Sequence, residues 1–326
     1  MEDRFGRQIN YLRISITDRC NLRCLYCMPQ DGIATRPRDE ILRMEEILRA
    51  AEIALQMGIN KFRLTGGEPL LRKGVIPFIK SLALWPGVKD IAVTTNGVLL
   101  QQLGGQLFDA GVKRLNISLD TLDSEKFRLI TRGGDFKQVW KGIEKVLEIG
   151  FQPVKLNIVA LRNFNDREWV DFARLTMDYP LHVRFIELMP IGTSWEMAGD
   201  SFASCQEIKD QIEHALGELC PKPKVQGSGP AEYYTLSGAK GTIGFIHAMS
   251  NHFCADCNRL RLTADGKLRP CLHDQHEVDL RDALRTGAGD EKLRQLFVKA
   301  VALKPANHHL ATGAPAAGRG MCQIGG

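Results

Sequence analysis

Three cysteines close to the start of the chain have the spacing of metal ligands. Cys20, Cys24 and Cys27 lie in the stretch TDRCNLRCLYCMP, with a C-x3-C-x2-C spacing. A closed structural zinc site takes four ligands, commonly from paired C-x2-C elements. Three thiolates on a four-iron cube instead leave one iron free for a ligand that is not protein. A chance cluster or a partial zinc site is the alternative interpretation of these three residues taken alone.

A second group of three cysteines lies in NHFCADCNRLRLTADGKLRPCL. Cys254, Cys257 and Cys271 are separated by a long gap, but Asp265-Gly266 within that gap is a strong hairpin signal. Pairing of the flanks about this turn sets Cys271 roughly opposite Leu260 and so brings it close to the other two. The sequence therefore predicts a second site with three thiolates.

Zinc is the leading alternative for this second group. His252 or His273 could complete a zinc site there, and on this segment alone zinc is slightly favoured. Arg259 and Arg261, on one face of the predicted hairpin strand, change that weighting. Two guanidiniums beside an incomplete metal site would bind a polyanion, because arginine contacts phosphate oxygens in bidentate fashion.

The composition is that of a globular protein. The chain has 326 residues, of which 44% are hydrophobic and 25% charged. That length suggests about two domains, although an α/β barrel can run to roughly 200–250 residues as one unit. The formal net charge of +5 fits an anionic small-molecule substrate and is too weak to argue for nucleic acid.

Cysteine usage indicates a reducing compartment. Six of the nine cysteines fall into the two groups, and the charged opening Met1–Arg4 is unlike a signal peptide. No apolar run is long enough to span a bilayer. We therefore expect a cytoplasmic protein with metal-binding thiols rather than disulfides. Cys205, Cys220 and Cys322 are expected to be ordinary thiols.

Strand-like runs alternate with amphipathic helical segments, which predicts βαβ units and a parallel sheet. The expected strands are Tyr11–Thr17, Lys61–Thr65, Asp90–Thr95, Arg114–Asp120, Val154–Leu161 and His182–Leu188. Helical segments include Met44–Met57, Val75–Leu84, Leu99–Ala110, Phe136–Ile149 and Asp166–Met177. Six such units could form an open, incomplete barrel or a doubly wound sheet.

Polar residues alternate with apolar ones in several of these strands, which favours the barrel. Crossover helices can cover only the apolar face, so the polar face must line a wet interior. Arg13, Arg63 and Lys155 would point into that interior. A buried cation without an anion is costly, so these three require a polyanionic ligand or, alternatively, an internal carboxylate.

The stretch 221–230 is rich in turn formers, and we expect a domain boundary there, dividing the chain into residues 1–220 and 221–326. Beyond it come short strands at Tyr233–Leu236 and Thr242–Ile246, the cysteine hairpin, and two helical segments up to about Lys304. The Gly/Ala-rich end, Ala311–Gly326, is expected to have little fixed structure unless something binds it.

The first cysteine stretch, with the aromatic Tyr26 directly before its third cysteine, resembles the signature of the radical S-adenosylmethionine (radical SAM) enzymes, in which the free iron binds SAM. Both triads, with NRLRLTADGKLRPCL and GRQINYLRISITDRCNLRCLYCMP, resemble the GTP-cyclising family among them, from Arg7 to the terminal Gly325-Gly326. The resemblance implies an α/β fold, an incomplete (β/α)6 TIM-like barrel with a C-terminal extension carrying a second cluster. It implies two [4Fe–4S] clusters on the six cysteines, with SAM and GTP as ligands.

The resemblance also implies which residues contact each ligand. The SAM contacts would be Tyr26, Gly67, Ser118 and Met189. The GTP contacts would be Arg13, Arg63, Thr94, Lys155, Arg259, Leu260 and Arg261, with Lys61 and Arg184 as weaker candidates. A catalytic role would fall to Arg13, Arg259 and Arg261. Plain turns, a buried hydroxyl, a core methionine and structural ion pairs are the ordinary alternatives for such residues.

The implied reaction converts GTP to (8S)-3′,8-cyclo-7,8-dihydroguanosine 5′-triphosphate, the first step of molybdenum cofactor biosynthesis. A 5′-deoxyadenosyl radical would take the ribose 3′ hydrogen, and the C3′ radical would attack C8 of guanine. Implied partners are a reductant or electron-transfer protein, a downstream cyclic pyranopterin monophosphate synthase and a possible homodimer, with neither nucleic acid nor membrane. The Gly-Gly end would reach the active site. A radical SAM peptide-modifying enzyme and a zinc-stabilised binding protein are the rival interpretations.

Overall fold

The computed structural model describes residues 1–34, 36–195, 199–223, 225–227, 229–308 and 319–325. Its strands are β1 (Tyr11–Ser15), β2 (Lys61–Thr65), β3 (Asp90–Thr95), β4 (Arg114–Ser118), β5 (Val154–Ala160), β6 (Leu181–Glu187), β7 (Cys220–Lys222), β8 (Glu232–Thr235), β9 (Thr242–Ile246), β10 (Arg259–Leu262), β11 (Lys267–Arg269) and β12 (Val278–Asp279). All twelve belong to one sheet in the order β12-β11-β10-β1-β2-β3-β4-β5-β6-β9-β8-β7.

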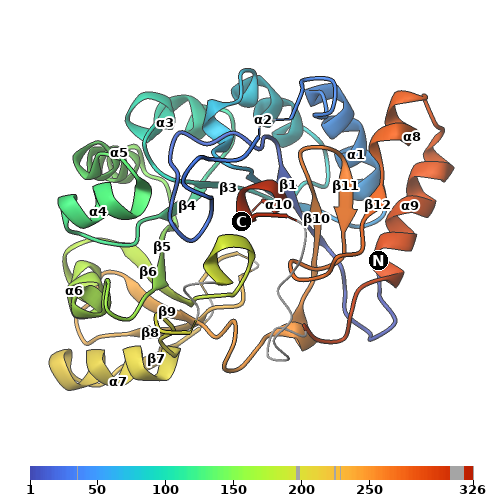
Figure 1. Cartoon of the computed structure of the whole chain (residues 1–326). Coiled ribbons are helices and arrows are strands. Elements are labelled where there is room, and N and C mark those ends of the chain that lie inside the picture. The colour runs from blue at the N-terminus through green and yellow to red at the C-terminus, as the bar shows by residue number, and fades with distance from the viewer. Residues whose placement is uncertain (35, 196–198, 224, 228, 309–318, 326) are drawn as a thin grey trace.

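The helices are α1 (Met44–Gln56), α2 (Val75–Ala83), α3 (Leu100–Asp109), α4 (Ser124–Thr131), α5 (Phe136–Ile149), α6 (Trp169–Asp178), α7 (Cys205–Leu216), α8 (Arg281–Arg285), α9 (Asp290–Ala302) and α10 (Met321–Ile324). Most of them surround the sheet, whereas α10 lies inside its curve (Figure 1). Helices α4 and α7 were not among the predicted segments, although each begins at a capping side chain, Asp123 and Ser204 respectively.

The six predicted strands form the middle of the sheet and run parallel, as the strand–helix alternation predicted. Two later strands extend this parallel array, since β10 pairs with β1 and β9 pairs with β6. Antiparallel neighbours complete both sides. Over the described residues the strand order has two ends and no pairing joins them, so the sheet is an open barrel.

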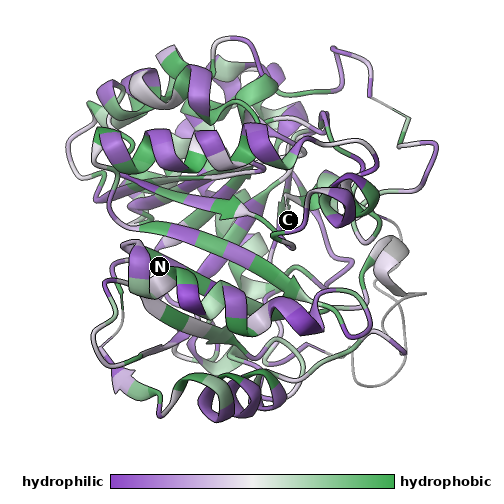
Figure 2. Ribbon diagram, turned by 90° about the vertical axis from the view of Figure 1, so that its left-hand side faces the viewer, coloured by the Kyte–Doolittle hydropathy of each residue, from purple (hydrophilic) through white to green (hydrophobic). Residues whose placement is uncertain are grey.

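The two faces of the central strands have different surroundings, which confirms the predicted incomplete barrel. Leu12 and Phe62 are fully buried in one apolar core with helix residues such as Ile47 and Ile79. The alternate residues Arg13 and Arg63 line a cavity on the other face. Figure 2 shows the outer helices carrying both hydrophobic and hydrophilic residues along their length, as expected for helices with one buried side.

The cysteine hairpin has a register one residue away from the predicted one. Its paired residues are Arg261 with Arg269 and Leu262 with Leu268. The backbone N–H of Thr263 donates to the carbonyl of Lys267 at 2.9 Å, so three residues make the turn instead of two. Continued at this register, the residue opposite Leu260 is Pro270, directly before Cys271. The hairpin still returns Cys271 to the other two cysteines.

The prediction for the C-terminal end is wrong where the structure describes it. Residues 319–325 contain helix α10, and Cys322 and Ile324 are buried. Residues 311–318 and 326 of the predicted unstructured segment lie outside the described residues. No helix among the described residues combines the length and the apolar character needed to cross a membrane.

Candidate active site

The first cysteine triad lies on the loop that follows β1 and faces the cavity. Cys20, Cys24 and Cys27 all line it. The loop is held by its own backbone, since the N–H groups of Cys27 and Met28 donate to the Cys24 carbonyl at 2.9 and 3.1 Å. The Cys20 sulfur accepts a hydrogen bond from the backbone N–H of Leu22 at 3.4 Å. Hydrogen bonds to the backbone therefore constrain the conformation of this loop.

The spacing of the sulfur atoms suits a cluster better than a single ion. Within the described part of the chain, neither cysteine triad brings its three sulfur atoms within 4.8 Å of one another. A tetrahedral ion with Zn–S bonds of about 2.3 Å would need them closer than this. A cluster spreads its ligands over separate irons. Burial raises the pKa of Cys20 to about 11 and that of Cys24 still further, so metal binding here must release protons.

Tyr26 connects the loop that carries the first cysteine triad to the segment directly after β4. Its hydroxyl donates to the Oδ2 atom of Asp120 at 2.6 Å, and the backbone N–H of Val159 donates to Oδ1 at 2.8 Å. Burial raises the pKa of Asp120 to about 6, although both hydrogen bonds act in the opposite direction. Asp120 thus joins β4, β5 and the cysteine loop.

Gly67 allows the turn after β2 to pack against the cysteine loop. A Cβ atom at Gly67 would lie 2.3 Å from the carbonyl oxygen of Arg19. The backbone N–H groups of Gly67 and Glu68 donate to Thr17 and Arg19 at 2.8 and 2.7 Å. Burial raises the pKa of Glu68 to about 7, while it accepts hydrogen bonds from residues of the same turn and of the end of β3.

The other predicted SAM contacts, Ser118 and Met189, line the same cavity as Tyr26 and Gly67. Ser118 ends β4, and Met189 follows β6. The Ser194 hydroxyl donates to the Met189 carbonyl at 2.6 Å and so fixes the chain there. The four predicted SAM contacts therefore line the same cavity as the first triad.

Buried cations gather on the cavity face of the sheet. Arg13, Arg63, Arg184, Arg259 and Arg261 all line the cavity. Burial together with neighbouring guanidiniums lowers the pKa of Arg63 and of Arg261 to about 10. The Nε atoms of Arg63 and Arg259 are buried without a hydrogen-bond partner. Since buried donors are normally paired, this surface is suited to an anionic ligand.

Thr94, also predicted to contact GTP, lines the cavity and its buried hydroxyl has no partner. Lys155 lies behind the lining residues, where its ammonium donates to the carbonyl of Gln226 at 2.6 Å. Burial and three neighbouring arginines lower the pKa of Lys155 to about 6. Leu260 is fully buried in the apolar core on the other face of β10, so only its backbone can approach the cavity. Lys61 is not among the lining residues.

The second triad lines the same cavity as the first. Cys254 begins the short 3-10 helix η4 (Cys254–Asp256), and Cys257 follows it. Lys304 is almost fully buried and donates to the Cys257 sulfur at 3.3 Å and to the carbonyls of Arg259 and Pro270 at 2.8 and 2.9 Å. Burial alone would raise the pKa of Cys257, but Arg259 and Lys304 lower it to about 7. This thiol is therefore prepared to act as a thiolate ligand.

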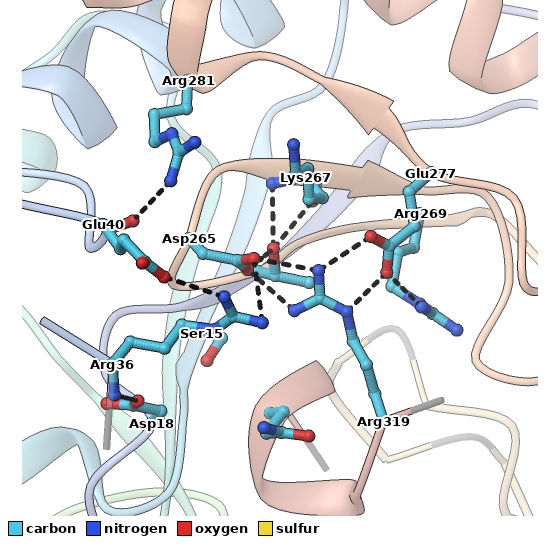
Figure 3. A network of polar contacts seen from close by, with 12 residues as sticks. Ser15, Asp18, Arg36, Glu40, Asp265, Lys267, Arg269, Glu277, Arg281 and Arg319 are labelled. Atoms are coloured by element: carbon cyan, nitrogen blue, oxygen red, sulfur yellow. Dashed lines mark hydrogen bonds and ion pairs between the residues drawn. The ribbon is translucent and has the colours of Figure 1, made fainter. Parts of the chain in front are cut away.

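The C-terminal segment enters the cavity and is anchored by ion pairs (Figure 3). Arg319 donates two hydrogen bonds of 2.9 Å to Asp265 and one of 2.8 Å to Glu277. Arg261 donates to the carbonyl of Gly325 at 3.1 Å. A Cβ atom at Gly325, where φ is +75°, would lie 2.9 Å from the Thr65 side chain. Only glycine fits this position without displacing a neighbour.

Four residues of this site were missed by the sequence reasoning. Asp120 carried a usable signal, because it is the last residue of a predicted barrel strand, Arg114–Asp120, and barrel sites form at such strand ends. Lys304 and Arg319 carried none, since a single cation after a helix or in a Gly/Ala-rich tail is ordinary. Cys322 was expected to be an ordinary thiol, yet it is buried beside Cys27 and hydrogen-bonds with that thiol, which raises the pKa of Cys27.

Two family profiles match the sequence. The one described as Radical SAM superfamily covers residues 14–176, and the one described as Molybdenum Cofactor Synthesis C covers residues 181–310. Proteins named GTP 3′,8-cyclase from Pelotomaculum thermopropionicum and Moorella thermoacetica are each 52% identical over 326 residues, covering 100% of this chain and of the relative.

Among solved structures, the chain resembles Streptococcus suis SuiB bound to S-adenosylmethionine, with a TM-score of 0.60 and 13% sequence identity. The match covers 88% of this chain and 68% of SuiB. At that identity the likeness concerns the fold alone, and it agrees with the open parallel barrel.

Proposed function

The chain belongs to the radical SAM superfamily and, within it, to the family of the GTP 3′,8-cyclases, and from this we propose that it cyclises GTP to (8S)-3′,8-cyclo-7,8-dihydroguanosine 5′-triphosphate in molybdenum cofactor biosynthesis. The observation that carries the proposal is the shared cavity. Both cysteine triads and five arginines line it. One cavity thus offers two incomplete metal sites together with several positive charges.

Cys20, Cys24 and Cys27 would hold a [4Fe–4S] cluster, and Tyr26, Gly67, Ser118 and Met189 would hold SAM beside it. A cluster of this kind supplies the one-electron reductive cleavage of SAM that starts radical chemistry. The residues of this chain would orient SAM and exclude water from it. Fixed geometry matters because carbon radicals react with almost any neighbouring group.

Cys254, Cys257 and Cys271 would hold a second [4Fe–4S] cluster, and residues 221–326 would supply it as a complement to the SAM-binding part, residues 1–220. Lys304 and Arg259 support this assignment because they stabilise the thiolate of Cys257. The spacing of the three sulfurs again disfavours one shared ion. The open iron of such a cluster would face the purine ring of GTP.

Arg13, Arg63, Arg259 and Arg261 would bind the triphosphate, together with Thr94, Lys155 and the backbone near Leu260. The buried Nε donors of Arg63 and Arg259 and the buried hydroxyl of Thr94, which have no partner, support this role, because arginine forms strong charge-assisted bonds with phosphate oxygens. Arg13, Arg259 and Arg261 would also fix the ribose relative to SAM. Gly325, held by Arg261, would close the cavity beside the bound nucleotide.

The remaining partners are proposed on the family alone. They are a reductant or electron-transfer protein, a downstream cyclic pyranopterin monophosphate synthase and a second copy of the chain in a homodimer. The radical SAM peptide-modifying alternative has no use for the buried cations, and we favour GTP for that reason.

The test is an anaerobic incubation of reconstituted protein with SAM, a reductant and GTP, followed by mass spectrometry of the nucleotide products. We expect 5′-deoxyadenosine and a cyclised GTP isomer to form in equal amounts. SAM cleavage that leaves GTP unchanged would contradict the proposal. A chain that takes up zinc but no iron when it is reconstituted anaerobically with iron and sulfide would contradict the whole enzyme interpretation.

A further inference from the structure

A set of ligands distinct from the cysteine triads lies beside the second triad. His252, Cys254 and His308 each offer one ligand atom, and the three atoms all lie within 4.8 Å of one another. All three residues line the cavity. Imidazole and thiolate are the ligands that zinc and related divalent ions prefer in proteins. The set therefore has the chemistry of a single-ion site, which neither triad has.

One ring nitrogen of His308 has a backbone partner. Its Nε2 atom lies 3.0 Å from the carbonyl oxygen of Ala248, so Nε2 must carry the proton and donate it. In the neutral ring the lone pair is then on Nδ1. Metal-binding histidines usually donate their other N–H to a carbonyl or carboxylate in this way, which fixes the tautomer and the ring orientation. The ring centroids of His252 and His308 are 4.8 Å apart.

The two segments that supply these ligands are held together without any metal. Arg7 donates to the carbonyl of Cys254 at 2.8 Å and to those of Pro305 and Ala306 at 2.7 and 3.2 Å. Its guanidinium is itself fixed by Asp3, at 2.6 Å. The backbone N–H of His308 also donates to the Cys254 sulfur. These contacts hold the segment of Cys254 close to the segment that ends at His308.

We propose that His252, Cys254 and His308 bind one divalent transition-metal ion, with Zn²⁺ as the expected occupant, in chains that lack the second cluster. Binding exchanges the Cys254 thiol proton for a sulfur–metal bond, and the proton leaves to solvent. A tetrahedral ion spaces its ligand atoms by roughly 3.5 Å, so the ligands must draw together slightly, which the exposed His252 side chain can do. The fourth position remains for water, as in open zinc sites.

This inference rests on the proposed function, because the ion and the proposed second cluster would compete for Cys254. Binding of the ion would therefore prevent insertion of that cluster. A chain loaded with zinc would keep the first triad free for its own cluster. It would cleave SAM but would not cyclise GTP. Zinc at this site is thus a specific inactive form of the protein.

The probe is Co²⁺ added anaerobically to the cluster-free full-length chain, in a background where Cys20, Cys24 and Cys27 are all serine. We expect one equivalent to bind, with a thiolate-to-cobalt charge-transfer band and the strong visible bands of a tetrahedral site. Cys254→Ser should remove the charge-transfer band. His252→Ala and His308→Ala should each weaken Co²⁺ binding at least about tenfold, whereas His214→Ala, an exposed control on α7, should leave it unchanged.

Cys257→Ser and Cys271→Ser separate this site from the triad. Both variants should retain the charge-transfer band, and its loss in either would overturn the proposed ligand set, as would unchanged binding in the two histidine variants. If zinc is added to the wild type before reconstitution, the iron content afterwards should be about four atoms per chain instead of about eight. If the triple-serine chain does not bind Co²⁺ while the reconstituted wild type cyclises GTP, this inference alone is refuted. If the triple-serine chain binds Co²⁺ but the reconstituted wild type never cyclises GTP, only the proposed function is refuted.

Discussion

Arg13 on β1 and Arg261 on β10 are register partners in adjacent parallel strands, although they come from opposite ends of the chain. Arg63 on β2 is the register partner of Arg13 on its other side. Three guanidiniums therefore lie in one row across the sheet, all buried. Like charges at such spacing repel, and burial removes the water that would screen them. The row is stabilised once a polyanion lies against it.

The first prediction concerns phosphate binding by Arg261. Arg261→Ala should weaken GTP binding by about 10- to 100-fold, since a hydrogen bond to a charged group contributes about 1.5–3 kcal/mol. SAM binding should change by less than about twofold. Anaerobic equilibrium binding of each ligand measures both effects, with Arg285→Ala, whose partner is Glu46 outside the cavity, as the control. Equal losses for GTP and SAM would contradict a phosphate-binding role.

Arg63 is expected to lower the stability of the ligand-free protein and to contribute to GTP binding. Arg63→Met removes one of the repelling cations and a buried Nε donor that has no partner. The ligand-free protein should therefore melt higher, by about 2–4 °C for each 1 kcal/mol gained, while the stabilisation that GTP gives the wild type should largely disappear. Thermal unfolding with and without GTP measures both. A variant that melts lower without ligand would show that Arg63 is already compensated in the free protein.

Lys155 should take up a proton when GTP binds. Its pKa of about 6 in the free protein leaves it largely neutral at pH 8. A nearby triphosphate favours the charged form and raises that pKa, so binding between about pH 7 and 9 should consume up to one proton. Calorimetry of GTP binding in buffers with different ionisation enthalpies measures the uptake. The prediction fails if Lys155→Met takes up as many protons as the wild type.

The two triads should be separable by single substitutions. Cys24→Ala should abolish SAM cleavage, because it removes one of the three thiols proposed to hold the cluster that binds SAM. Cys257→Ala should retain SAM cleavage and about half of the iron, yet lose GTP cyclisation. Cys220→Ala, at an exposed thiol outside the cavity, is the matched control and should retain both activities. Normal cyclisation by the Cys257 variant would show that the second triad holds no essential cluster.

Much of the fold was predictable from local patterns. Strand β2 and helix α5 have the predicted bounds, because alternation in Lys61–Thr65 and the helical period in Phe136–Ile149 report directly which face is buried. The first cysteine group was recognisable for a similar reason, since Cys20, Cys24 and Cys27 are close together in sequence, and its role as a metal site stays a prediction. The hairpin register was not predictable, because a two-residue and a three-residue turn share the signal Asp265-Gly266.

Contacts between distant parts of the chain left no comparable signal. The sequence of Arg259–Leu262 does not indicate that this strand pairs in parallel with β1. That pairing depends on how the whole barrel folds. Composition also misled at the C-terminus. The Gly/Ala-rich tail indicates coil, but Arg319, Cys322 and Ile324 each find a specific partner or pocket that lies far away in sequence. Specific anchors of this kind override composition.

The last prediction concerns the anchor of that tail. Arg319→Ala removes the ion pairs to Asp265 and Glu277 (Figure 3), of which the first is largely buried. Breaking such a pair costs about 3 kcal/mol, so amide hydrogen exchange in residues 320–325 should accelerate by about 100-fold. GTP turnover should fall because Gly325 no longer lies against Thr65, while SAM binding should be retained. Arg319→Lys should give an exchange rate and a GTP turnover between those of the wild type and Arg319→Ala. Arg294→Ala, which breaks only exposed ion pairs and one exposed hydrogen bond to Gln56, is the control. Unchanged exchange in the Arg319→Ala tail would show that the tail does not depend on the Arg319 ion pairs.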